Sequence, residues 1–327
     1  MRTYLDFEKP VAELEDKIDS LRNIDDERSA AEVEPELKRL EEKSDKLLRE
    51  LYDGLSRWQK TQVARHPSRP HFLDYSTGLA SGFTELCGDR AFGDDRAIIG
   101  GVGHIGHHRC IIMGHEKGTD TESRLTHNFG MARPEGYRKA IRLVEMAERF
   151  NIPVVTLVDT AGAYPGRGAE ERGQAEAIAS STAKFLEAKV PVVSVITGEG
   201  GSGGAVALAA ANKVLMLEHS VYSVISPEGC AAILWKDAMA KGENKAPDAA
   251  DAMKISAQDL LQLGVIDGII PEPVGGSHRA PDLAMAAVRD AISSELDELV
   301  KLDAGGLVQQ RREKFLELGR QGLDAAA

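Results

Sequence analysis

The sequence predicts an α/β fold with a largely parallel sheet that is covered on both faces. Short aliphatic runs, such as 154–158 and 192–196, alternate with helical stretches in the middle of the chain. These runs are apolar at nearly every position, which is typical of strands buried on both faces of a sheet. The chain has 327 residues, of which 42% are hydrophobic and 28% charged, and this suits one large domain with appendages or two small domains.

Residues 1–70 are rich in charge and leucine and predict a helical hairpin packed on a body or on a partner. Apolar residues recur at helical spacing over 11–21 and again over 37–58. Pro35 fits the first turn of the second helix, where a missing N–H costs nothing. The heptads are too few for a free-standing coiled coil.

The core is expected over 71–275 and contains the alternating strands and helices. Strands are expected at 98–102 and 110–113, paired across a His/Gly turn, and as buried runs at 154–158, 192–196 and 214–217. Helices are expected over 134–150 and 169–188, and from near Gly203. Ser226 and Ser256 fit N-cap positions, and Gly264 fits a helix end. The C-terminal part, 276–327, predicts two further charged helices.

Charge and cysteine content exclude several classes of function. The formal net charge of -12 repels phosphate backbones, so we do not expect nucleic acid as a main partner. The three cysteines, Cys87, Cys110 and Cys230, form no C-x-x-C pair and suit a reducing compartment. The N-terminus has no apolar leader segment, and no uncharged run approaches the ~20 residues that cross a bilayer. We therefore expect a cytoplasmic protein that does not interact with membranes.

The most informative segment is the glycine-rich run 197–205, between a buried strand and a helix. Glycines permit a sharp turn and a close ligand, and the first amides of a helix favour an anion. Ala205 stands where a P-loop needs lysine. Gly198, Gly200 and Gly203 match a dinucleotide fingerprint, but they fall late in the chain. An oxyanion hole and a tight turn without a ligand both stay open.

A second glycine-rich loop, 159–168, follows the strand at 154–158. Open α/β sheets place ligands at the carboxyl ends of their strands, and the two loops leave consecutive strands on the same edge. A shared site is therefore favoured over two surface loops. Lys117, after the strand at 110–113, is a possible contact for a phosphate or carboxylate of a substrate, although a solvated lysine is the commoner outcome.

The histidines His104, His107, His108 and His115 raise the question of a metal site. His104 and His107 are expected on a turn, without a helical i, i+4 pair and without an acidic ligand nearby. We therefore expect a solvated turn and no metal on this chain.

Several strings resemble the alpha-subunit family of bacterial and plastid acetyl-CoA carboxylase carboxyltransferase. They are GEGGSGG, DTAGAYPG, RGQAEAIA, YSVISPEGCAAILWK, NFGMARPEGYRKA and IIPEPVGGSHR in the core, with LDFEKPVAELEDKID and QVARHPSRPHFLDY near the N-terminus. The resemblance covers nearly the whole chain. It implies a crotonase-like (ClpP/crotonase) superhelix of β-β-α units with an N-terminal helical hairpin and C-terminal helices.

The resemblance also implies an activity and partners. The chain would help transfer a carboxyl group from biotin on a biotin carboxyl carrier protein to acetyl-CoA, giving malonyl-CoA for fatty acid synthesis. A beta subunit with a zinc ribbon would complete an α2β2 assembly, and a biotin carboxylase would load the biotin. ATP is not expected to bind this chain.

Site residues follow from the same resemblance, motif by motif. Gly203 and Gly204 would give main-chain donors to the ureido oxygen of biotin, each contributing ~3 kcal/mol. Carboxybiotin would also be lined by Gly162, Ala163, Tyr164, Pro165, Gly166, Gly201 and Ser202. Ala161 replaces a proline that is usual in the family, and 125–127 replaces a usually basic stretch. Residues 238–244 look like a short insertion of no obvious role.

Two other functions are weighed against this one. A stand-alone hydratase or thioesterase of the same fold would need a side-chain acid or base beside the glycine loop, and Glu199 is the close candidate. A non-catalytic scaffold would use the helical ends, around Leu47 and Leu51, as docking faces. The glycine loop favours the carboxyltransferase over both.

Overall fold

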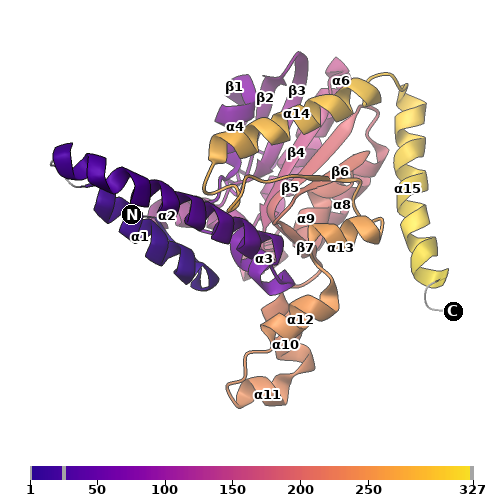
Figure 1. The fold of residues 1–327 in the computed structure, drawn as a ribbon. Coiled ribbons are helices and arrows are strands. Elements are labelled where there is room, and N and C mark those ends of the chain that lie inside the picture. Colours follow the sequence, from indigo (N-terminus) through magenta and orange to yellow (C-terminus); the bar gives the residue numbers. More distant parts are fainter. Residues whose placement is uncertain (1, 24–26, 325–327) are drawn as a thin grey trace.

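The structure is a computed structural model that describes residues 2–23 and 27–324, with side chains described over 2–23 and 33–320. Across that described part, we find no helix with the length and apolarity that a bilayer span requires. A mixed sheet forms the centre, and helices lie on both of its faces (Figure 1).

The sheet has eight strands, seven of which follow the order β1-β2-β3-β4-β5-β6-β8, while β7 pairs with β5. Pairing is antiparallel from β1 to β3 and parallel from β3 onward, so the predicted parallel sheet is confirmed for most of its width. The strands are β1 (Ala80–Glu85), β2 (Ile98–Ile105), β3 (His108–His115), β4 (Val154–Thr160), β5 (Val192–Gly201), β6 (Lys213–Leu217), β7 (Val221–Ser223) and β8 (Gly268–Ile270).

Two apolar clusters, one on each face, hold the sheet between helices. On one face the cluster includes Val154, Val192 and Ile196 with α6 (Pro134–Phe150), α8 (Gln174–Glu187) and α9 (Ser202–Ala209). On the other face it includes Val155 and Val193 with α4 (Phe72–Leu79) and α14 (Pro281–Leu299). Successive residues along β4, and likewise along β5, therefore pack into the clusters on opposite faces, as the continuous apolar runs predicted.

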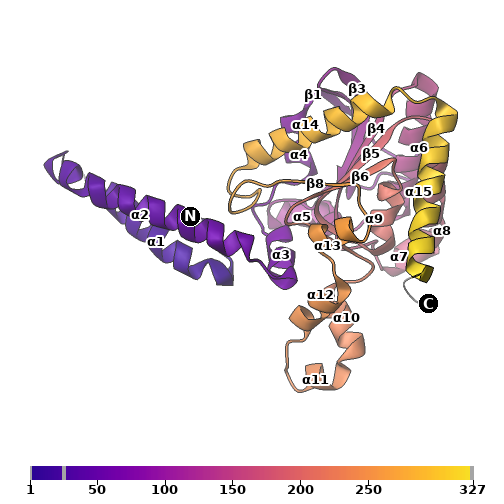
Figure 2. The same cartoon turned by 45° about the vertical axis from the view of Figure 1, so that its right-hand side comes forward.

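The N-terminal hairpin consists of α1 (Lys9–Arg22) and α2 (Glu27–Asp53), and α3 (Arg57–Ala64) joins it to the core. Both views show the hairpin projecting away from the sheet (Figures 1 and 2). Pro35 lies inside α2, so its predicted place in the first turn is wrong. The run before it is rich in Ala and Glu, and this helix-forming sequence extends the helix upstream at the cost of one backbone hydrogen bond.

The predicted helix over 134–150 is confirmed as α6. The predicted helix over 169–188 is wrong as one piece, because it is split into α7 (Arg167–Glu171) and α8. Gly173, with a φ of 80°, adopts a left-handed conformation between them and redirects the chain. Ser226 and Ser256 both cap helices as expected, accepting hydrogen bonds from Gly229 N and Asp259 N.

Shorter elements complete the chain. Three helices, α10 to α12, form a lobe that extends from the core at the carboxyl edge of the sheet (Figure 1). It contains residues 238–244, which form the end of α11 and the loop after it. The remaining elements are η1 (Asp6–Glu8), α5 (Thr121–Thr126), η2 (Asn128–Gly130), α10 (Pro227–Leu234), α11 (Lys236–Ala240), α12 (Ala246–Met253), α13 (Ala257–Gln262) and α15 (Ala304–Asp324).

Candidate active site

The glycine turn joins β5 to α9 at the carboxyl edge of the sheet. β5 is buried along its whole length, and α9 begins immediately after it at Ser202. Gly203 and Gly204 therefore occupy the second and third positions of the helix, where peptide nitrogens have no acceptor within the helix. No side chain caps this end among the described residues. The turn consequently has the backbone arrangement that stabilises an anion.

Glycine is required at this turn because the loop after β4 packs directly against it. A Cβ at Gly201 would lie 2.2 Å from the Ala161 carbonyl oxygen. A Cβ at Gly204 would lie 2.7 Å from the Ala163 nitrogen, whereas at Gly203 it would meet only a methyl of Ile178, at 3.3 Å. The predicted meeting of the two glycine-rich loops is therefore confirmed.

The loop over 159–166 is held by hydrogen bonds at both ends. The Thr160 hydroxyl donates to the Gly162 carbonyl at 2.9 Å and accepts from the Gly162 nitrogen at 3.1 Å. Further along, Gln174 donates to the Tyr164 carbonyl at 3.0 Å. The Tyr164 ring folds back against Gly166, and the Arg133 guanidinium lies 5.0 Å from the ring centre. These hydrogen bonds anchor the loop on both sides of Ala161, while Pro165 is exposed.

An apolar cavity of about 380 Å³ opens beside the turn. Its lining joins the start of α9 to β7, α12 and α13 and consists of Ser202, Val206, Tyr222, Ser223, Val224, Met253, Leu260 and Val265. Ser202 is exposed and has a φ of 54°, which is uncommon outside glycine. Strained residues of this kind cluster at ligand sites.

Behind the turn lies a network of ion pairs that connects five segments of the chain. The Lys117 ammonium is 2.6 Å from Asp159 Oδ1 and 3.7 Å from Glu199 Oε2. Arg65, directly after α3, donates to Glu199 Oε1 at 2.6 Å and to Glu228 Oε1 at 2.5 Å. Lys117 is therefore paired with a buried carboxylate of the protein, and its role as a possible substrate contact stays a prediction.

Asp159 is the centre of this network. Burial by itself would raise its pKa, but the Lys117 ammonium and His71, whose Nδ1 is 3.3 Å away, hold the pKa of Asp159 well below its usual range. The ionised carboxylate also accepts the Glu199 backbone N–H at 2.8 Å. Asp159 thereby ties the end of β4 to β5 just before the glycine turn.

Sequence reasoning missed Arg65 and Tyr137. Arg65 lies in a string that resembled the family, but its acidic partner Glu199 follows 134 residues later, and no local pattern links them. The Tyr137 hydroxyl is buried and lies 3.1 Å from where a Gly204 Cβ would be. Tyr137 fills the space behind the turn, whereas the sequence predicts it only as part of a helix.

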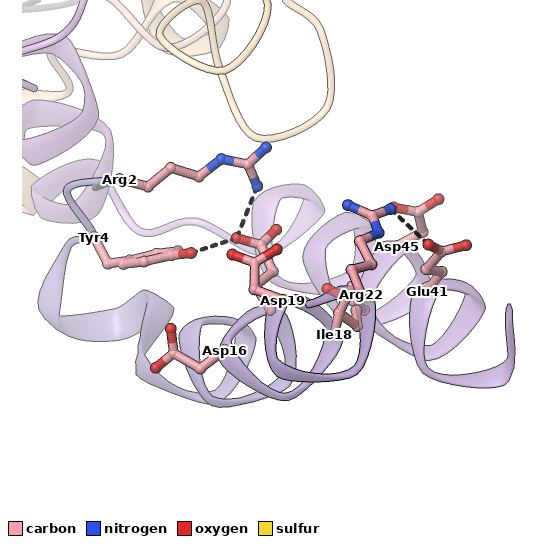
Figure 3. Close-up of a pocket in the computed structure, with 10 residues that line it drawn as sticks. Arg2, Tyr4, Asp16, Ile18, Asp19, Arg22, Glu41 and Asp45 are labelled. Atoms are coloured by element: carbon pink, nitrogen blue, oxygen red, sulfur yellow. Dashed lines mark hydrogen bonds and ion pairs between the residues drawn. The ribbon is translucent and has the colours of Figure 1, made fainter. Parts of the chain in front are cut away.

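A larger cavity of about 520 Å³ lies away from the turn, between the N-terminal segment and the hairpin. Figure 3 shows two ion pairs among the charged groups that line it. Arg2 is 3.1 Å from Glu15, and Arg22 is 2.6 Å from Glu41. The first pair ties the N-terminal segment to α1, and the second ties α1 to α2.

Solved structures at 15–20% identity show the fold class to which the chain belongs. Transcarboxylase 12S superimposes with a TM-score of 0.58 at 20% identity, covering 73% of this chain and 44% of that one. The Pseudomonas malonate decarboxylase MdcD-MdcE hetero-dimer gives a TM-score of 0.57 at 15% identity, covering 77% of this chain and 98% of that chain. The crotonase-like fold expected from the sequence is confirmed.

The sequence narrows this class. The chain belongs to the acetyl co-enzyme A carboxylase carboxyltransferase-like family, which it matches over residues 4–319. It is 60% identical over 321 residues to the acetyl-coenzyme A carboxylase carboxyl transferase subunit alpha of Methylobacterium nodulans, covering 98% of this chain and all of that protein. The Rhodopseudomonas palustris protein of the same name is also 60% identical, with 98% of each chain covered.

Proposed function

We propose that this chain is the alpha subunit of an acetyl-CoA carboxylase carboxyltransferase. In this proposal it acts in the cytoplasm, where the enzyme transfers a carboxyl group from carboxybiotin to acetyl-CoA and supplies malonyl-CoA for fatty acid synthesis. The observation that carries the proposal is the glycine turn, where helix amides without an acceptor in their own helix pack against an anchored loop, with an apolar cavity beside Ser202.

The residues present fit the head group of biotin. This group is a small fused ring with an apolar side and a polar ureido edge, and it arrives on a carrier protein. A cavity of about 380 Å³ lies within the range of small-molecule sites, and its lining is apolar except for Ser202, Ser223 and the Tyr222 hydroxyl. When bound, carboxybiotin supplies the activated carboxyl group.

The work of this chain in the reaction is electrostatic. The Gly203 and Gly204 N–H groups donate to the ureido oxygen, where negative charge develops, and the positive end of the α9 dipole adds to this effect. Each such donor contributes ~3 kcal/mol to transition-state stabilisation. The loop from Gly162 to Gly166 packs against the turn at Gly204 and limits the access of water to the reacting oxygen.

A partner subunit is needed to complete the site. Near the cavity, Val224, Ile233 and Leu234 are 79%, 69% and 66% exposed, and apolar residues so exposed suit a protein interface. We assign this surface to a beta subunit that carries a zinc ribbon, in an α2β2 assembly, and we expect that subunit to bind the acetyl-CoA thioester. The biotin carboxyl carrier protein and a biotin carboxylase would serve the same complex.

The stand-alone hydratase or thioesterase is not favoured. Its candidate acid or base, Glu199, accepts two hydrogen bonds from Arg65, at 2.6 and 3.1 Å, and lies 3.7 Å from Lys117. These contacts fix the orientation of the carboxylate and occupy it with two cations of the protein itself.

Reconstitution tests the proposal. The purified chain alone should form no malonyl-CoA from carboxybiotin and acetyl-CoA, and addition of purified beta subunit should restore the reaction. Full activity of the chain without a partner would contradict the proposal, as would a reconstituted complex that stays inactive while binding both substrates.

A further inference from the structure

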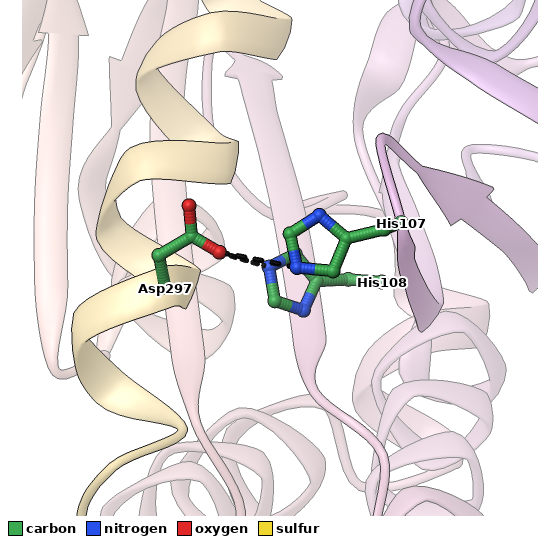
Figure 4. A group of neighbouring side chains, drawn as sticks. All are labelled: His107, His108 and Asp297. Atoms are coloured by element: carbon green, nitrogen blue, oxygen red, sulfur yellow. Dashed lines mark hydrogen bonds and ion pairs between the residues drawn. The ribbon is translucent and has the colours of Figure 1, made fainter.

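A second cluster of ligand-type side chains lies away from the glycine turn, at the hairpin between β2 and β3 (Figure 4). His107 lies in the turn, His108 begins β3, and Asp297 comes from α14. His107 Nε2 is 3.2 Å and His108 Nε2 is 2.8 Å from the same oxygen, Asp297 Oδ1. The expectation that the histidine turn has no acidic neighbour is therefore wrong. The sequence did not show this neighbour because Asp297 follows His108 by 189 residues.

We propose that His107, His108 and Asp297 form a Zn²⁺ site that fastens the β2–β3 hairpin to α14. Imidazole nitrogens and carboxylate oxygens are common zinc ligands, at about 2.0–2.2 Å from the ion. Ligands of a tetrahedral ion with such bonds lie about 3.3 Å from one another. The two N···O distances lie within about 0.5 Å of this value, and all three ligand atoms lie within 4.8 Å of one another.

The fold brings the backbone segments that carry these ligands together before any ion arrives. Gly106 has a φ of 58°, and a Cβ there would lie 3.2 Å from the Ser293 hydroxyl, so the turn rests closely on α14. Next to it, Ile105 and Ile292 are both buried in the apolar cluster on this face of the sheet. His107 precedes the strand, so the alternation of strand side chains does not force it away from His108.

Exposure of the cluster allows an ion to enter. The side chain of His108 is 8% exposed, whereas those of His107 and Asp297 are 74% and 50% exposed. Three protein ligands leave the fourth tetrahedral position to water. Two imidazoles favour Zn²⁺ and similar transition metals over Mg²⁺, which prefers oxygen ligands.

A competing group of possible ligands, Glu85, Cys87 and Asp94, lies on the exposed surface. The Cys87 thiol donates to Glu85 at 3.3 Å, and this hydrogen bond raises the pKa of the thiol. Zinc binds the thiolate, so a thiol that retains its proton is a poorer ligand. The histidine cluster is therefore the stronger candidate, and the cysteine is removed in the test.

The test uses the full chain without a polyhistidine tag and with Cys87→Ser, titrated with ZnCl₂ by calorimetry. We expect one ion per chain and a Tm that rises with ZnCl₂ but not with MgCl₂. His107→Gln and Asp297→Asn should each weaken binding by at least about tenfold. These two side chains are exposed, and circular dichroism without metal verifies that the variants fold.

The matched control is His104→Gln, a nearby histidine on β2 outside the cluster, which should bind zinc like the parent. Cobalt(II) in place of zinc gives a second readout, because intense visible bands report tetrahedral geometry. Absence of stoichiometric binding in the Cys87→Ser protein would overturn the proposal. So would a His107→Gln variant that binds zinc as tightly as the parent.

Discussion

Substitution of Gly204 by alanine should separate catalysis from folding. The added Cβ would lie 2.7 Å from the Ala163 nitrogen, where ordinary contact begins at 3.4 Å, so the loop over 159–166 must retreat by about 0.7 Å. It would also lie 2.8 Å from the Gly162 carbonyl carbon, and neither neighbour is a flexible side chain. The loop and the helix amides would then separate.

The size of the effect follows from this displacement. A misplacement of about 1 Å at a reacting group costs ~10²-fold in rate, and loss of one oxyanion donor costs ~10²–10³-fold. We therefore expect Gly204→Ala to lower the kcat of the reconstituted enzyme by roughly 10²-fold. Overpacking of this kind costs about 1–3 kcal/mol in stability, so the Tm should fall by only a few degrees.

Gly203→Ala is the matched control, one residue away in the same helix turn. Its Cβ would meet only the Ile178 methyl, at 3.3 Å, and that side chain can shift by a few tenths of an ångström. This variant keeps its peptide N–H, so its kcat should stay within roughly tenfold of the parent. Steady-state malonyl-CoA formation by both variants measures the difference. Equal kcat losses in the two variants, or none in Gly204→Ala, would refute the reasoning.

Two further predictions concern the charged and buried groups near the site. Lys117→Met leaves the buried Asp159 carboxylate without its closest cation, so urea unfolding should show a loss of about 3 kcal/mol in the free energy of unfolding. The control Lys189→Met changes an exposed lysine and should cost almost nothing. Equal losses in the two variants would contradict the ion-pair account. Burial lowers the pKa of His115 from 6.5 to about 4. Between these two pH values the unfolded chain binds a proton at His115 and the native chain does not. The free energy of unfolding should therefore fall by about 3 kcal/mol as the pH falls from about 6.5 to about 4. His115→Gln should flatten the free energy of unfolding across that pH window, and a curve parallel to that of the parent would show that His115 is not the group responsible.

The central strands, and the sheet edge at which the glycine-rich loops lie, were predictable because burial on both faces produces continuous apolar runs in the sequence. The runs at 154–158 and 192–196 became β4 and β5, and the two glycine-rich loops met as consecutive parallel strands require. β1 was missed, since Ala80–Glu85 lies at the sheet edge with four of its six residues exposed and so shows no apolar periodicity. Gly173 likewise interrupts a helical pattern through backbone conformation, which composition alone does not show.

Contacts between distant segments mark the limit of sequence reasoning about the site. Glu199 was visible as an acid beside the glycine turn, but its pairing with Arg65 depends on how α3 docks against β5. The histidine turn met Asp297 for the same reason, because α14 crosses the sheet face above the hairpin. Local sequence spacing predicts neither contact, since both follow from tertiary packing.

The most direct measurement is a crystal structure of the chain reconstituted with its beta subunit and bound to biotin. We expect the ureido oxygen within about 3 Å of the Gly203 and Gly204 nitrogens, with the ring in the cavity beside Ser202 and Tyr222. Biotin bound elsewhere, with those two nitrogens bonded to the protein itself, would contradict the account.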